Sequence, residues 1–155
     1  MIELEGKFKL DSSNKTRERI KQISRLEEIT LEENCVFPLK ESYIRFRKTE
    51  TRTYFTYKGK NKSSKFNKVR EIEFNVPKFI FDIARSFSKY KYRKVRETYF
   101  HKNALICLDF VFDLGYFVEI EAKSEEDISF IKKQLNISSP NINDHYWKLI
   151  KPKYL

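Results

Sequence analysis

Apolar and charged side chains alternate along residues 2–10 of this chain. Successive side chains of a β-strand point to opposite faces, so the pattern predicts a strand with one apolar face. The other face carries two acids followed by two bases, Glu3, Glu5, Lys7 and Lys9. The alternation recurs at residues 118–121, where two more carboxylates share a face between apolar residues.

Helical periodicity or capping residues mark four other segments. Polar N-cap candidates at residues 11–14 precede apolar residues at every third position, which predicts a helix over residues 14–28 that uses Ile20, Ile23, Leu26 and Ile29. Pro77 opens a second helix, whose apolar side is formed by Phe79, Ile80, Ile83 and Phe87. Ser124 and Asp127 form a capping box for a third helix, and a short fourth helix is expected around residues 144–150.

The remaining chain is rich in short β-like runs. Residues 43–47 and 52–58 predict a hairpin, residues 59–65 a polar basic loop, and residues 69–76 the next strand. Strands are also expected over 92–100, 104–112 and 116–122, the last two joined by a turn at 113–115. Seven or eight hairpin-linked strands with three or four helices indicate an α+β fold that is mainly antiparallel, a closed barrel or strongly curved sheet with helices outside.

Size and composition limit the alternatives. A chain of 155 residues with 40% hydrophobic content fits a single folded domain over residues 1–155. No apolar run is long enough to span a membrane, and the early charges do not resemble a signal peptide, so a cytoplasmic location is expected. Cys35 and Cys107 match no metal-binding spacing, which favours reduced structural thiols. A net charge of +10 indicates an anionic partner, whether nucleic acid, a membrane surface or a polyphosphate.

Each predicted strand places its charged residues on one face, opposite an apolar face. A half-solvated sheet would give the same alternation. If the sheet closes into a barrel, however, the charged faces converge on one interior, where Arg and Lys suit phosphate and carboxylates suit Mg²⁺ or Mn²⁺. The charged set comprises Glu3, Glu5, Lys7, Arg45, Arg47, Lys58, Glu71, Glu73, Lys94, Arg96, Asp109, Glu119 and Glu121.

A family resemblance rests on these same strands. The Glu-x-Glu-x-Lys signature at residues 3–7 resembles that of the CYTH superfamily, also called triphosphate tunnel metalloenzymes. The later motifs follow in the order of that family and span nearly the whole chain: Tyr43-Ile44-Arg45-Phe46-Arg47, Thr56-Tyr57-Lys58-Gly59, Glu71-Ile72-Glu73, Lys94-Val95-Arg96, Leu108-Asp109 and the segment 114–121.

The resemblance implies a closed tunnel of eight antiparallel strands that acts on triphosphates with Mg²⁺ or Mn²⁺. The metal-binding acids would be Glu3, Glu5, Glu119 and Glu121, with Asp109 and Glu73 as further candidates. The phosphates would be held by Lys7, Arg45, Arg47, Lys58, Lys94 and Arg96. The catalytic set would be Glu5, Glu71 and Lys7, with Glu71 as the candidate base for the attacking water.

Several residues depart from this scheme or stay outside it. Arg70 directly precedes Glu71, so its side chain should lie on the opposite face of the strand and point outward. Lys9 and Thr98 stay open between the tunnel rim and solvent. The segment 32–42 is short compared with the loop of many family members, which favours a small substrate. His101 and His145 are assigned packing or solvated roles. The C-terminal helix carries Tyr146 and Trp147, and the family resemblance suggests that such a helix can plug one mouth of the tunnel.

Four functions remain open. The first is hydrolysis of inorganic tripolyphosphate to pyrophosphate and phosphate, and the second is a class IV adenylyl cyclase that converts ATP to cyclic AMP. The third is hydrolysis of thiamine triphosphate or a nucleoside triphosphate. The fourth is a non-catalytic polyphosphate- or RNA-binding module, which gains nothing from four carboxylates on its binding face. The expected partner is a small polyanion rather than nucleic acid or a membrane, and a homodimer stays open.

Overall fold

The computed structural model describes residues 2–61 and 65–154. Residues 62–64, which belong to the predicted basic loop, lie outside the described residues. The strands are β1 (Ile2–Leu10), β2 (Arg25–Pro38), β3 (Ser42–Lys48), β4 (Thr53–Asn61), β5 (Asn67–Asn75), β6 (Tyr90–His101), β7 (Ala104–Val111) and β8 (Gly115–Ala122). The helices are α1 (Asn14–Ile23), α2 (Lys78–Phe87), α3 (Glu125–Gln134) and α4 (Tyr146–Tyr154).

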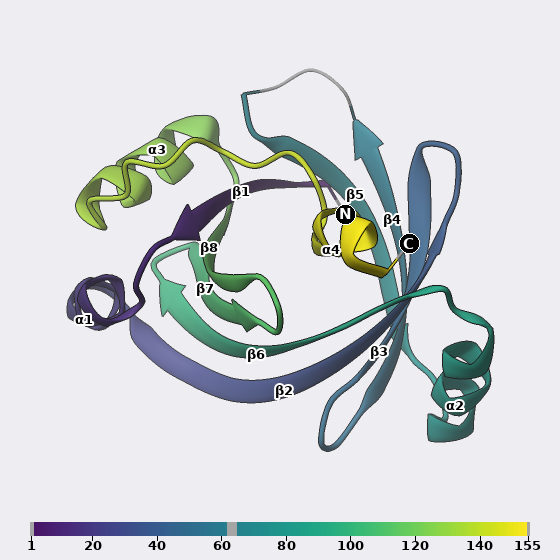
Figure 1. Cartoon of the computed structure of the whole chain (residues 1–155). Helices are drawn as coiled ribbons and strands as arrows, with labels where there is room; N and C mark the ends of the chain where they lie inside the picture. The colour runs from purple at the N-terminus through teal and green to yellow at the C-terminus, as the bar shows by residue number, and fades with distance from the viewer. Residues whose placement is uncertain (1, 62–64, 155) are drawn as a thin grey trace.

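The strands form one closed antiparallel barrel in the order β1-β5-β4-β3-β2-β6-β7-β8 (Figure 1). Closure depends on β1, which pairs with β5 on one side and with β8 on the other. This pairing places Glu5 opposite Glu121 and Lys7 opposite Glu119. The predicted α+β barrel is therefore confirmed, and the charged faces of strands from both ends of the chain meet inside it.

The main hydrophobic core lies outside the barrel rather than within it. The outward apolar faces of β1, β7 and β8 pack against α1 and α3, and the buried cluster includes Phe8, Ile20, Ile106, Val118, Ile120, Ile128 and Leu135. Gly6 is needed under α3, because a Cβ at this position would lie 2.8 Å from Cγ2 of Ile128. Ser124 caps α3 by accepting a hydrogen bond from the Asp127 backbone amide, as the capping box predicted.

Helix α4 has a different position from the other three. Tyr146 and Ile150 pack against Val36, Tyr43, Tyr92, Val111 and Phe117, which lie on five strands of the barrel. Figure 1 shows α4 within the curve of the sheet, whereas α1, α2 and α3 lie outside it. An apolar plug therefore closes one mouth of the tunnel. None of the described helices has the length and hydropathy needed to cross a membrane.

Three predictions about elements were wrong. The helix over residues 14–28 ends at Ile23, and the chain then continues as β2, so that Leu26 and Ile29 are exposed strand residues. Residues 59–61 extend β4 rather than starting a loop. In α2 the buried residues are Phe81 and Ala84, while Phe79, Ile83 and Phe87 of the predicted apolar face are exposed. In each case tertiary contacts overrode a local pattern.

Candidate active site

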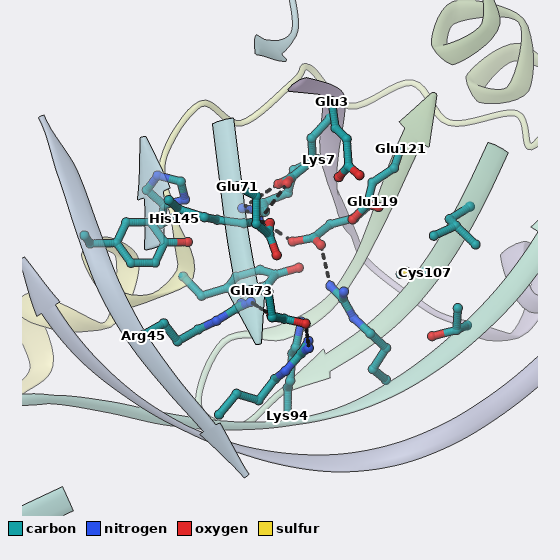
Figure 2. Close-up of a pocket in the computed structure, with 18 of the residues that line it drawn as sticks. Glu3, Lys7, Arg45, Glu71, Glu73, Lys94, Cys107, Glu119, Glu121 and His145 are labelled. Atoms are coloured by element: carbon teal, nitrogen blue, oxygen red, sulfur yellow. Dashed lines mark hydrogen bonds and ion pairs between the residues drawn. The ribbon is translucent and has the colours of Figure 1, made fainter. Parts of the chain in front are cut away.

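A cavity of about 270 Å³ occupies the interior of the barrel. Every charged residue predicted for the site lines it except Asp109, and they come from β1, β3, β4, β5, β6 and β8. Figure 2 shows Glu3, Glu71, Glu119 and Glu121 near one another, with Arg45 and Lys94 lower in the view. The alternation of each strand is the local cause, because it turns every second side chain inward.

Three carboxylates crowd together where β1 meets β8. Glu5, Glu119 and Glu121 each place an oxygen within 4.8 Å of the others. Burial, and then the neighbouring charge of Glu5, raise the pKa of Glu121 to about 7. Burial and Glu71 likewise raise the pKa of Glu3. Hard oxygen ligands at this separation fit Mg²⁺ or Mn²⁺, and a cation would relieve the repulsion that holds a proton on Glu121.

Two lysines lie among these carboxylates. Nζ of Lys7 lies 3.6 Å from Glu5 and 3.5 Å from Glu119. Nζ of Lys58 lies 3.4 Å from Glu5 and 3.1 Å from Glu71. Burial acts to raise the pKa of Glu71, but the cations Lys58 and Arg45 outweigh it, so the pKa lies below the ordinary value. Glu71 is therefore ionised at neutral pH and able to accept a proton.

Two arginines of β3 reach Glu73 of β5 across the intervening strand β4. Nη2 of Arg47 donates to Oε1 of Glu73 at 2.8 Å, and Nη2 of Arg45 lies 3.6 Å from Oε2. Thr56 donates its hydroxyl to the same carboxylate at 2.6 Å. Glu73 thus already has three polar partners, which distinguishes it from the crowded carboxylates of β1 and β8. This arrangement fits a residue that orients the arginines better than a metal ligand.

Asp109 lies behind the lining and is fully buried. Its carboxylate accepts hydrogen bonds from Arg96 at 2.7 Å, from Nζ of Lys94 at 3.1 Å and from the hydroxyl of Tyr146 at 2.9 Å. Arg96 also bonds to Glu119. Burial acts to raise the pKa of Glu119, but Arg96 and Lys7 outweigh it and hold the pKa well below its usual range. Asp109 therefore fixes the bases of β6, and its geometry does not favour the predicted metal role.

The structure adds residues that the sequence did not assign to the site. Glu32 on β2 is buried, with Nζ of Lys94 and Nη1 of Arg47 each 3.6 Å away. Burial acts to raise the pKa of Glu32, but Lys94 and Arg96 lower it to about 2. Glu32 and Asn34 are two positions apart and therefore share the inward face of β2. This spacing could have predicted their position, but β2 was not recognised as a strand.

Other positions left open by the sequence are now placed. Thr98 lines the cavity, whereas Lys9 is exposed, bonds to the Leu114 carbonyl and lies over the Phe117 ring. Arg70 is exposed outside the barrel, as its parity predicted. Cavity-lining residues absent from the predicted set also include Tyr43, Tyr92, Cys107, His145 and Tyr146. The Tyr43 and His145 rings are 4.5 Å apart, so His145 has a packing role at the edge of the cavity.

The fold and the site define a closed-barrel protein whose interior is lined by closely spaced acids and bases. The CYTH domain model matches residues 1–142, and the chain belongs to this family. A comparison with curated proteins gave no match.

Solved structures share the fold over nearly their full length. PH1012 from Pyrococcus horikoshii OT3 is 23% identical, with 95% of this chain and 98% of that chain covered and a TM-score of 0.83. A conserved hypothetical protein from Pyrococcus furiosus is 21% identical, with 96% and 99% covered and a TM-score of 0.84. A candidate adenylate cyclase from Vibrio parahaemolyticus is 15% identical, with 97% and 98% covered and a TM-score of 0.77. At these identities the likeness shows the fold alone.

Proposed function

We propose that this protein is a divalent-metal-dependent triphosphatase that hydrolyses inorganic tripolyphosphate, or a related triphosphate, to pyrophosphate and phosphate. The main support is the interior of the barrel, where the Glu5, Glu119 and Glu121 carboxylates crowd within 4.8 Å in a cavity that is also lined by lysines and arginines. Membership of a family that includes triphosphate-processing enzymes supports the same class. The proposal places the protein in the cytoplasm and gives it a small polyanion as substrate.

In this proposal Glu5, Glu119 and Glu121 hold Mg²⁺ or Mn²⁺, with Glu3 beside them. Bound there, the ion would neutralise charge on the phosphate oxygens and on the leaving group. The donor set carries this assignment, since all three groups are carboxylates and Glu121 has a pKa of about 7 without a cation.

The bases of the chain would bind and orient the phosphates. Lys58 and Lys7 reach into the space between the acids, while Arg45, Arg47 and Arg96 offer planar pairs of donors suited to phosphate oxygens. Glu71, ionised and 3.1 Å from Lys58, would accept the proton of the attacking water. The water oxygen then bonds to the terminal phosphorus, the bridging P–O bond breaks, and pyrophosphate leaves with the bonding electrons.

Cavity size favours a compact substrate. About 270 Å³ is below the common range for organic ligand pockets, roughly 300–1,000 Å³, and α4 closes one mouth. This supports tripolyphosphate over a nucleoside triphosphate. It also argues against a polyphosphate- or RNA-binding module, which would require a groove open along its length.

One observation favours a class IV adenylyl cyclase as a second candidate. A cavity of about 430 Å³ lined by Tyr43, His145 and Trp147 shares its first two residues with the tunnel. Aromatic walls beside a triphosphate site suit a purine ring. ATP bound across both cavities would then give cyclic AMP and pyrophosphate.

Product analysis separates these activities. We expect purified protein with Mg²⁺ or Mn²⁺ to release phosphate from tripolyphosphate and to form no cyclic AMP from ATP, with products separated by ion-exchange chromatography. Glu5→Gln and Glu119→Gln should each lower kcat by about 100-fold or more, since each removes a charge that acts in the transition state. Glu126→Gln, an exposed change on α3, is the matched control. Robust cyclic AMP formation, or full activity in both site variants, would contradict the proposal.

A further inference from the structure

Helices cover the outside of the barrel unevenly. Helix α3 packs on β1 and β8, α1 contributes Ile20 to the same core, and α2 packs on β2 and β3. Within the described chain, no helix packs closely on β4 or β5 (Figure 1). The outward side chains of β4 and β5, together with those of β2 and β3 that α2 leaves uncovered, therefore form an open face on the side of the barrel opposite α3, at whose β2 edge Cys35 is buried.

This face is a grid of uncharged residues two rows deep and four strands wide. Strand register aligns one row across the strands as Cys35, Phe46, Phe55 and Phe74. The adjacent row consists of Phe37, Ile44, Tyr57 and Ile72. Charged residues border these rows at Arg70 on one side, at Glu33 and Lys48 on the other, and at Lys91 of β6 beside Cys35.

The aromatic rings of the grid are in contact with one another. Ring centroids are 6.0 Å apart for Phe37 and Phe46, 5.4 Å for Phe46 and Phe55, and 4.9 Å for Phe55 and Phe74. The β5 edge is the most accessible part, with Ile72 at 54% and Phe74 at 53% exposure. A continuous aromatic row with an exposed edge is a surface that water solvates poorly.

Helix α2 borders the grid on the β2 and β3 side and exposes Phe79, Ile83 and Phe87. Large apolar side chains carry about 150–250 Å² each, so the exposed parts of these three residues, Ile72 and Phe74 amount to roughly 500 Å². The half-buried rings of the grid add to this value. The total approaches the ~800 Å² that each partner of a standard interface buries, and it is large for a surface left to solvent.

We propose that a second copy of this chain covers this face, which makes the protein a twofold symmetric homodimer. A twofold axis between Phe46 and Phe55 would place the Phe46 ring of each chain against the Phe55 ring of the other chain. Such a self-complementary arrangement is that of an isologous interface. Chains of net charge +10 repel one another, so they can meet closely only where charge is absent, and the grid is such a place. The interface lies on the outer faces of strands whose inner faces line the tunnel. The proposed dimer therefore does not depend on the proposed function.

The mass in solution tests the proposal. Light scattering coupled to size-exclusion chromatography at about 50 μM should give twice the chain mass of 18.8 kDa for the unchanged protein. Phe74→Glu and Ile72→Lys should each shift the mass to that of one chain, because a buried unpaired charge is costly. Both residues face away from the tunnel, so triphosphatase activity and the far-ultraviolet circular dichroism spectrum should be retained in these variants.

Phe130→Glu is the matched control, since Phe130 is 57% exposed but lies on α3. It should remain dimeric. A single-chain mass for the unchanged protein overturns the proposal, including the case in which that monomer binds phospholipid vesicles or another protein through the grid. The proposal is also overturned if Phe130→Glu dissociates the dimer while Phe74→Glu and Ile72→Lys fold and remain dimeric.

Discussion

Neighbouring glutamates of β8 show how surroundings set the chemistry of one residue type. Glu119 and Glu121 are two positions apart on the same inward face, where Glu119 is buried and Glu121 is half-buried. Arg96 and Lys7 outweigh the burial of Glu119 and lower its pKa, whereas burial and Glu5 raise the pKa of Glu121 to about 7. The same strands flank both residues, but Lys7 of β1 stands opposite Glu119 and Glu5 stands opposite Glu121, so the order of residues along β8 alone could not predict the difference.

This difference gives the metal-free protein a pH-dependent stability. The pKa of Glu121 is raised from 4.5 to about 7 on folding, so its stabilising contribution is present below pH 4.5 and is lost as the pH rises through 7. We expect the free energy of unfolding, measured with urea in the presence of a chelator, to fall by about 2.5 kcal/mol from pH 5 to pH 8. Mn²⁺ should restore stability at pH 8, and Glu121→Gln should flatten the profile. Equal stability at both pH values would contradict this assignment.

Secondary-structure elements could be predicted where the two faces of a strand differ in polarity, as in β1, β3, β6 and β8. The 14-residue strand β2 was missed because Leu26 and Ile29 continued the helical spacing of Ile20 and Ile23 by coincidence. Pairing with β6 along nearly its whole length holds this segment extended, and such nonlocal pairing leaves no local signal. The missed strand carried one of the missed residues, Glu32.

Packing of α3 against β1 predicts the effect of changing a glycine. Gly6→Ala would place Cβ 2.8 Å from Ile128 and 3.0 Å from the Phe8 ring, so the helix must shift. We expect a loss of about 1–3 kcal/mol in the free energy of unfolding, measured by urea denaturation. Gly59→Ala is the matched control, because its Cβ would meet no atom closer than 3.6 Å and should change stability by less than about 0.5 kcal/mol. Similar losses in both variants would show that packing against α3 is not the cause.

The plug helix α4 is joined to the site through Tyr146. Its hydroxyl donates to Asp109 at 2.9 Å, and Nζ of Lys7 lies 4.4 Å from its ring centroid. Tyr146→Phe should cost about 1–2 kcal/mol of stability, since one buried hydrogen bond is lost while the ring remains. Tyr146→Ala should cost about 3–5 kcal/mol and should raise KM for tripolyphosphate, because Lys7 and the plug lose their support. Identical KM values for both variants and the unchanged protein would argue against any link between α4 and the site.

The distribution of charge over the molecule differs from what the net charge suggested. Acids and bases line the cavity in equal number, and the buried acids Glu32 and Asp109 lie behind them. The net charge of +10 therefore arises outside the tunnel, mostly on exposed lysines and arginines. These can steer an anion towards the molecule, but the cavity itself has no excess of positive charge to bind it.

An electrically balanced cavity should bind tripolyphosphate well only together with a cation. We expect isothermal titration calorimetry with Glu71→Gln, used to slow turnover, to show a Kd about 100-fold lower with Mg²⁺ than with a chelator, equivalent to about 2.7 kcal/mol. Glu121→Gln added to this variant should reduce the difference, because one metal-binding carboxylate is lost. Equal affinity with and without Mg²⁺ would show that the bases alone hold the substrate.

The order of residues along the chain was enough to predict the alternation of the strands, the capping of α3, the outward position of Arg70 and the family of the protein. Each of these features depends on residues that are neighbours in the sequence or on short motifs within single strands. Closure of β1 onto β5 and β8, the crowding of Glu5 with Glu121, the plug formed by α4 and the uncovered face of β2 to β5 arise from the three-dimensional arrangement. Alternation fixes which side chains share a face, but only long-range strand pairing fixes which faces meet each other and which meet water.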